Sequence, residues 1–110
     1  MAKHYFFDRL QSLNLSNNKI HHLPTSIGDL PNLIGLDLCV NELEALPESI
    51  GRLEKLRLLD LRQNKLTDLP ETLANVKDLI VLDCSKNLIE KLPRELRHLK
   101  SLQVGKFQPI

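Results

Sequence analysis

Three carboxylates recur at one fixed spacing: Asp37, Asp60 and Asp83 lie 23 residues apart, and Asn14 occupies the position 23 residues before Asp37. If each lies on a strand of one parallel sheet, neighbouring side chains stand about 4.8 Å apart in a column. Carboxylates at that distance repel one another unless a cation, a basic ligand or nearby Lys and Arg side chains offset their charge. The column is therefore a candidate surface for a basic group.

Residues that could carry out catalysis or bind a metal are sparse. The sequence contains no Gly-rich phosphate loop, no nucleophile elbow and no Cys-x-x-Cys or His-x-x-x-His spacing. His21 and His22 are adjacent, and neighbours in an extended segment point in opposite directions, so the pair converges poorly on one ion. We expect no catalytic residue, no metal and no cofactor.

The two cysteines are not expected to form a disulfide. Cys84 takes a position that Leu fills in three equivalent segments, which predicts a small core residue. Cys39 lies one place past the equivalent position, where strand alternation points its side chain to the opposite face. Reduced thiols are typical of a cytoplasmic or nuclear protein.

Composition argues against nucleic-acid binding and against a membrane span. The formal net charge is only +1 and aromatic residues make up 4% of the chain, which disfavours nucleic-acid binding. No stretch approaches the 18 or more apolar residues that a membrane span needs, and no apolar core of a signal peptide is found.

The elements that position these residues follow from a repeat. The phrase Leu-x-x-Leu-x-Leu-x-x-Asn recurs four times at a period of 23, with Cys84 in place of the last leucine in the fourth copy, and its first leucines are Leu10, Leu33, Leu56 and Leu79. Its Leu-x-Leu centre predicts a short strand with leucines on one face and spacers on the other. The asparagines that end the phrase can satisfy backbone groups left unpaired at the bend, and they form a predicted structural ladder: Asn18, Asn41, Asn64 and Asn87.

A second phrase fills the rest of each repeat. Its apolar residues lie three or four apart, and Pro24, Pro47, Pro70 and Pro93 make a long helix improbable. We expect an extended Leu-Pro segment and a short 3-10 or α turn. One unit cannot bury its own leucines, but stacked copies can. The predicted fold is an α/β right-handed solenoid with a parallel sheet on its concave face and the turns on its convex side.

These phrases resemble the leucine-rich repeat family, and Leu-Pro-x-x-Ile-Gly-x-Leu at residues 23–30 and 46–53 is similar to its intracellular 23-residue class. That class includes Ras-pathway scaffolds, cell-polarity scaffolds of the Scribble and Erbin type, and plant Ras-group repeat proteins. The match covers residues 10–101, with Cys84, Ala74 and Arg97 departing from the pattern. The resemblance implies a protein-interaction module.

Domain boundaries follow the period. Residues 10–101 form four repeats, at 10–32, 33–55, 56–78 and 79–101. Residues 1–9 resemble the tail of a preceding or degenerate repeat, since Phe7 matches Leu30 and Leu53 in spacing. Residues 102–110 are a degenerate or truncated fifth repeat, with Val104 expected to extend an outward column. Because repeat arrays need polar caps, we expect the chain to be part of a longer protein.

The outward spacers of the strands are the candidate binding residues. An acidic column lies beside an apolar column that includes Leu58 and Val81, and Arg62 is placed to pair with Asp37 or Asp83. The predicted concave partner site comprises Asn14, Ser16, Asp37, Cys39, Leu58, Asp60, Arg62, Gln63, Val81, Asp83, Ser85 and Lys86. Alternatively, the aspartates are default sequence of this repeat class, in which Leu-Asp-Leu is common.

The sequence thus favours a non-catalytic, cytoplasmic signalling scaffold or adaptor. Its expected partner is a protein that offers a basic and aliphatic segment, or, as the resemblance to Ras-pathway scaffolds implies, a small GTPase-pathway protein. Two alternatives stay open: substrate-recognition repeats of a multidomain ubiquitin ligase, kinase or GTPase, and a truncated product with no selected partner.

Overall fold

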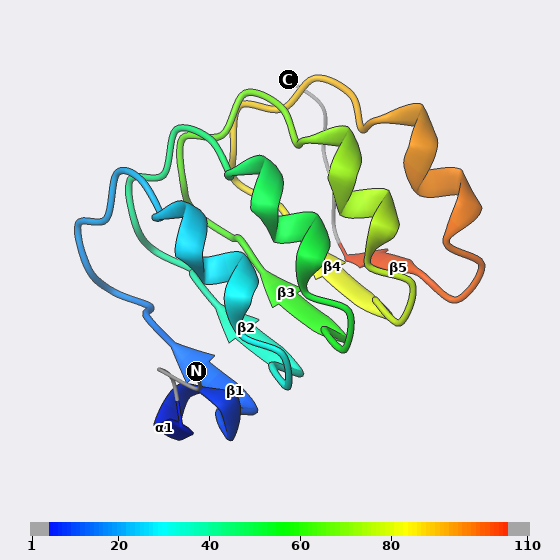
Figure 1. Ribbon diagram of the computed structural model, residues 1–110. Coiled ribbons are helices and arrows are strands. Elements are labelled where there is room, and N and C mark those ends of the chain that lie inside the picture. Colours follow the sequence, from blue (N-terminus) through cyan, green and yellow to red (C-terminus); the bar gives the residue numbers. More distant parts are fainter. Residues whose placement is uncertain (1–4, 106–110) are drawn as a thin grey trace.

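Five parallel strands lie side by side in chain order in a computed structural model, which describes residues 5–105 (Figure 1). The strands are β1 (Ser12–Asn14), β2 (Gly35–Asp37), β3 (Leu58–Asp60), β4 (Val81–Asp83) and β5 (Gln103–Gly105). Four 3-10 helices stack beside one another on the return side, and a short α1 (Tyr5–Asp8) precedes β1. The helices are η1 (Thr25–Asp29), η2 (Glu48–Arg52), η3 (Glu71–Asn75) and η4 (Arg94–His98). The predicted solenoid of parallel strands and short 3-10 turns is confirmed.

The core lies between the sheet and the 3-10 helices. The central strand residues Leu36, Leu59 and Leu82 are fully buried, whereas the residues on either side of them are half-buried or exposed. This alternation is the two-residue period of the sequence. Each 3-10 helix starts after a proline whose carbonyl accepts the first helical hydrogen bond, as in Ile50 N–H to Pro47 O at 3.0 Å. Proline suits that position because it has no backbone N–H, so no donor is left without a partner at the start of the helix.

Close packing of η1, η2 and η3 explains the two glycines of the Ile-Gly pattern. A Cβ at Gly28 would overlap the Ser49 carbonyl oxygen, and a Cβ at Gly51 would overlap that of Thr72. Adjacent helices therefore approach backbone to backbone, which only glycine permits at these positions. Cys84 is also a core residue, because it is buried beside the leucines as its position predicts.

The fifth strand corrects one expectation. Val104 was expected in the outward column after Val81, but Val81 pairs with Gln103 and Val104 pairs with the buried Leu82. The register therefore advances by 22 residues instead of 23 at this step. In earlier repeats one carbonyl accepts two amides, as Arg57 O does from Ile80 and Val81, but within residues 5–105 only Gln103 donates to Ile80 O. The shift places an apolar Val, and not Gly105, against the core.

A recurrent left-handed residue precedes each asparagine of the ladder. Asn17, Val40, Gln63 and Lys86 have φ between 56° and 58°. Asparagine tolerates this conformation, whereas a β-branched residue is a genuine outlier there. Val40 is half-buried, so the second repeat retains a strained residue at the bend that follows β2.

We predict that Val40→Asn raises the free energy of unfolding by about 1 kcal/mol, because asparagine adopts this φ at lower cost. Urea denaturation of the two proteins measures the difference. Gln63→Val is the matched control: its side chain is exposed at the same φ, so we expect a loss of similar size. A lower stability of Val40→Asn would show that packing of the valine outweighs the strain.

Candidate functional site

The outward columns of the sheet assemble as the repeat requires. Asn14, Asp37, Asp60 and Asp83 pair in register across β1 to β4, and Ser12, Gly35, Leu58 and Val81 do the same one step earlier in each strand. We call the surface formed by these two columns the sheet face. Leu58 is 44% exposed, which is unusual for a leucine in a protein whose other strand leucines are fully or largely covered. The sheet face thus combines carboxylates with accessible aliphatic surface.

Each member of the acidic column also has a structural task that the sequence analysis missed. One side-chain oxygen accepts a hydrogen bond from the backbone N–H two residues later, at 2.9 Å for Asn14, 3.0 Å for Asp37, and 3.1 Å for Asp60 and Asp83. These are Asx turns, which close the bend after each strand. Asn14 makes the same bond without a charge, so the fold needs the oxygen and not the negative charge.

Arg62 offsets part of the carboxylate repulsion. Its guanidinium contacts Asp60 Oδ2 at 2.7 Å and lies 3.8 Å from Asp83 Oδ2. The pairing with Asp83 was expected. The closest partner, however, is Asp60 of the same repeat, because residues two apart on a strand project from the same face. Hydrogen bonds to Asp60 raise the pKa of Arg62, which remains charged at every accessible pH.

The next column consists of Ser16, Cys39, Arg62 and Ser85, and its members other than Arg62 are less accessible than expected. Cys39 is only 9% exposed although it lies on the predicted outward side. Burial raises the pKa of its thiol, and Asp37 adds to the effect. Burial, with a smaller contribution from Asp83, raises the pKa of Cys84 to about 11. Both cysteines are free thiols.

Asp37, Cys39 and Asp60 place one potential ligand atom each within 4.8 Å of one another. Their environment opposes a bound cation, because the raised pKa keeps the Cys39 thiol protonated and Arg62 already occupies Asp60. The exposed members of the predicted set are Asn14, Leu58, Arg62, Gln63 and Lys86, while Cys39 is buried and the remaining members are half-buried. The sheet face can therefore offer hydrogen bonds, charge and apolar contact to a ligand.

The ladder asparagines make contacts within the fold. Asn64 Nδ2 donates to the carbonyls of Leu38 and Leu61, both at 3.0 Å, and its Oδ1 accepts from Leu43 N–H at 2.9 Å. Asn41 and Asn87 repeat these bonds one repeat earlier and later.

His21 lies away from His22, with ring centroids 6.5 Å apart, and faces Glu42 and Glu44 at 3.8 and 3.7 Å. No helix within residues 5–105 has the length and apolar character to cross a bilayer.

Comparisons with known proteins agree with this architecture. The family model described as leucine-rich repeat region matches residues 7–104. A leucine-rich repeat protein of Leptospira interrogans is 39% identical, with a TM-score of 0.76, over 86% of this chain and 25% of that chain. The plant peptide hormone receptor RGFR1, solved in complex with RGF2, is 34% identical, with a TM-score of 0.80, over 89% of this chain and 16% of that chain. A comparison with curated protein sequences gave no match.

We predict that the structural and charge roles of the acidic column separate on substitution. Asp83→Ala removes the acceptor for Ser85 N–H and Oγ, so the free energy of unfolding should fall by about 1 kcal/mol. Asp83→Asn keeps an acceptor, as Asn14 does, and should cost much less. Urea denaturation measures both. Equal losses for the two variants would contradict the Asx-turn role.

Proposed function

Since this chain belongs to the leucine-rich repeat family, we propose that it is a non-catalytic module that holds a protein partner against the sheet face. The observation that carries the proposal is the exposed Leu58 beside the carboxylates of Asp60 and Asp83, all on one rigid sheet. Aliphatic surface bordered by fixed charges favours a protein segment over a small metabolite as the ligand. An interface between proteins needs no enclosed pocket, whereas a small metabolite does.

The geometry refines the chemistry of the partner. Arg62 binds Asp60 and approaches Asp83, so Asp37 is the carboxylate of the column outside its reach. A Lys or Arg of the partner would meet Asp37, while an aliphatic side chain would cover Leu58 and Val81. Contacts to Arg62, Gln63 and Lys86 at the bends would surround this centre, as polar groups do at the rim of interfaces.

Three further observations support a biological setting and ligand binding. The Leu-Pro-x-x-Ile-Gly-x-Leu segments resemble those of Ras-pathway and polarity scaffolds, which supports a signalling scaffold or adaptor with a small GTPase-pathway partner. Both cysteines are free, which is typical of a reducing cytoplasm. The plant receptor solved in complex with RGF2 supports ligand binding by a similar array.

A second candidate is the substrate-recognition part of a larger multidomain enzyme, such as a ubiquitin ligase, kinase or GTPase. The chain spans only 25% and 16% of the two similar structures, so repeats of this kind also occur within longer proteins. Such substrate-recognition repeats would bind their protein substrate through the same sheet-face chemistry as the module proposed above.

The test compares partners captured from cell extract by wild type and by two sheet-face variants. Leu58→Lys inserts a charge into the aliphatic centre and should weaken a specific partner about tenfold or more. Asp37→Asn/Asp60→Asn/Asp83→Asn removes the charge while keeping the Asx acceptors. Quantitative mass spectrometry of captured proteins gives the readout.

Arg97→Ala, on the exposed side of η4, is the matched control and should capture the same partners as wild type. Thermal unfolding verifies that each variant is folded. If every specific partner binds both sheet-face variants as strongly as wild type, the proposed function is wrong.

A further inference from the structure

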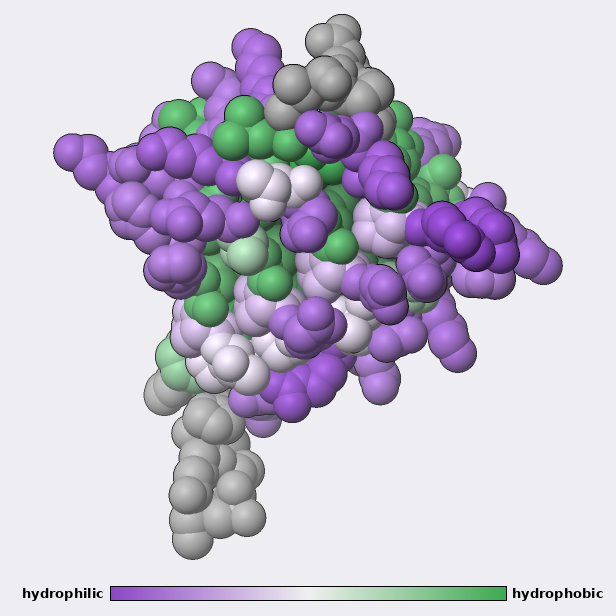
Figure 2. All heavy atoms as spheres, turned by 90° about the horizontal axis from the view of Figure 1, so that it is seen from above, coloured by the Kyte–Doolittle hydropathy of each residue, from purple (hydrophilic) through white to green (hydrophobic). Residues whose placement is uncertain are grey.

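A groove of about 870 Å³ opens between the third and fourth repeats, away from the sheet face. Its walls are the segments 67–71 and 88–95, which carry the extended Leu-Pro stretches and the starts of η3 and η4. Figure 2 looks down on the loops of Figure 1, and apolar surface shows there between hydrophilic side chains. The volume suits several side chains of a peptide.

Leu88 is the aliphatic residue that distinguishes this groove. It is 51% exposed, and the equivalent positions of the other repeats carry the charged residues Lys19, Glu42 and Lys65. The fold therefore tolerates a charge at this position and gains little core packing from the leucine. Leu92 and Pro93 line the groove beside it and are themselves half-buried.

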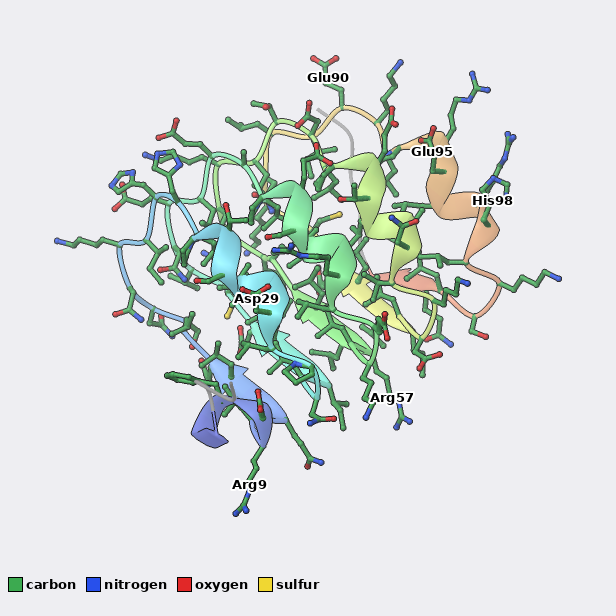
Figure 3. The ribbon with its side chains drawn as sticks, in the orientation of Figure 1. Arg9, Asp29, Arg57, Glu90, Glu95 and His98 are labelled. Carbon is green, nitrogen blue, oxygen red and sulfur yellow. The ribbon has the colours of Figure 1, made fainter. Side chains whose placement is uncertain are left out.

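The rim of the groove is acidic. Asp68, Glu71, Glu90 and Glu95 contribute carboxylates, against the two cations Lys91 and Arg94. Figure 3 shows Glu90 projecting from the loop before η4 and Glu95 near the start of that helix. The rim carries a net charge of −2, that is, two positive against four negative groups, so it repels phosphate groups and attracts cationic side chains.

The charged side chains of the rim do not take part in ion pairs that stabilise the described part of the fold. Among residues 5–105, none of the six forms an ion pair with another side chain. The corresponding region of the earlier repeats differs, because Glu42 there lies 3.8 Å from His21 and 3.5 Å from Lys65. Glu42 and Glu44 are thus paired, whereas the four rim carboxylates around the exposed Leu88 form no ion pair within residues 5–105.

We propose that this groove is a second docking surface, which takes an extended segment of a partner protein with an aliphatic side chain flanked by Lys or Arg. The aliphatic side chain packs on Leu88, Leu92 and Pro93. The flanking cations meet Glu71 and Glu90 on the two walls. No residue of the sheet face lines the groove, so this surface is independent of the proposed function.

The experiment uses a displayed library of short peptides with one fixed central leucine and random flanks as the probe. Peptides selected on the wild-type chain should be enriched in Lys and Arg on one or both flanks. A selected peptide should bind Leu88→Lys about tenfold or more weakly. Glu71→Gln/Glu90→Gln should weaken it as well and reduce the dependence of its dissociation constant on salt.

Two controls make the outcome decisive. Leu88→Lys copies the residue found at Lys65, so its thermal unfolding should match wild type and exclude misfolding. Asp37→Asn/Asp60→Asn/Asp83→Asn should leave peptide binding unchanged. Peptides that lack flanking cations, or that bind Leu88→Lys as tightly as wild type, would overturn the proposal. Peptides that are lost only on the sheet-face variant would overturn it while supporting the sheet face as a binding surface.

Discussion

The stacking of each repeat on the next depends on the side-chain amides of Asn41, Asn64 and Asn87. Each amide nitrogen donates to a backbone carbonyl of its own repeat, which is that of Leu38, Leu61 or Cys84, and to a leucine carbonyl of the preceding repeat; each amide oxygen accepts a backbone N–H of the preceding repeat. Asn41 and Asn64 are only 7% and 8% exposed, so losing one amide would leave several covered backbone groups without partners. Each unpaired backbone group costs about 1–3 kcal/mol of folding free energy. The asparagine and the 23-residue spacing between repeats therefore cannot change one without the other at little cost.

Because this ladder and the buried leucines hold the backbone, the spacers are free to vary, but not equally. The sheet-face aspartates close a bend with one oxygen and present charge with the other, so the column serves fold and surface together. The fold does not require Leu58 or Arg62 in the same way, because other repeats carry different residues at the equivalent positions. Ser12 and Gly35 replace the leucine, and Ser16 and Ser85 replace the arginine. We therefore expect residues such as Leu58 and Arg62 to determine which partner binds.

The period was enough to predict the parallel sheet, the 3-10 turns after proline and the core position of Cys84, because leucine spacing and proline geometry act locally. The Asx turns were missed because a carboxylate oxygen that bonds the backbone looks, in sequence, like one that awaits a ligand. The Arg62–Asp60 contact was missed because side-chain conformers decide between neighbouring carboxylates. The shifted register of β5 was missed because a fixed period was extended to Val104, whereas burial of an apolar side chain took priority.

The two proposed surfaces share repeats three and four, yet the structure gives them little means of influencing each other. The sheet face and the groove are separated by side chains such as Leu59, Leu61, Leu66 and Leu82, none of which is exposed. Such a core is packed as tightly as a crystal and does not deform gradually. In a solenoid each repeat contacts only its neighbours, so strain at one surface also has few routes along the array. A partner at one surface should therefore leave the affinity at the other unchanged, and simultaneous binding would join two proteins through proximity alone.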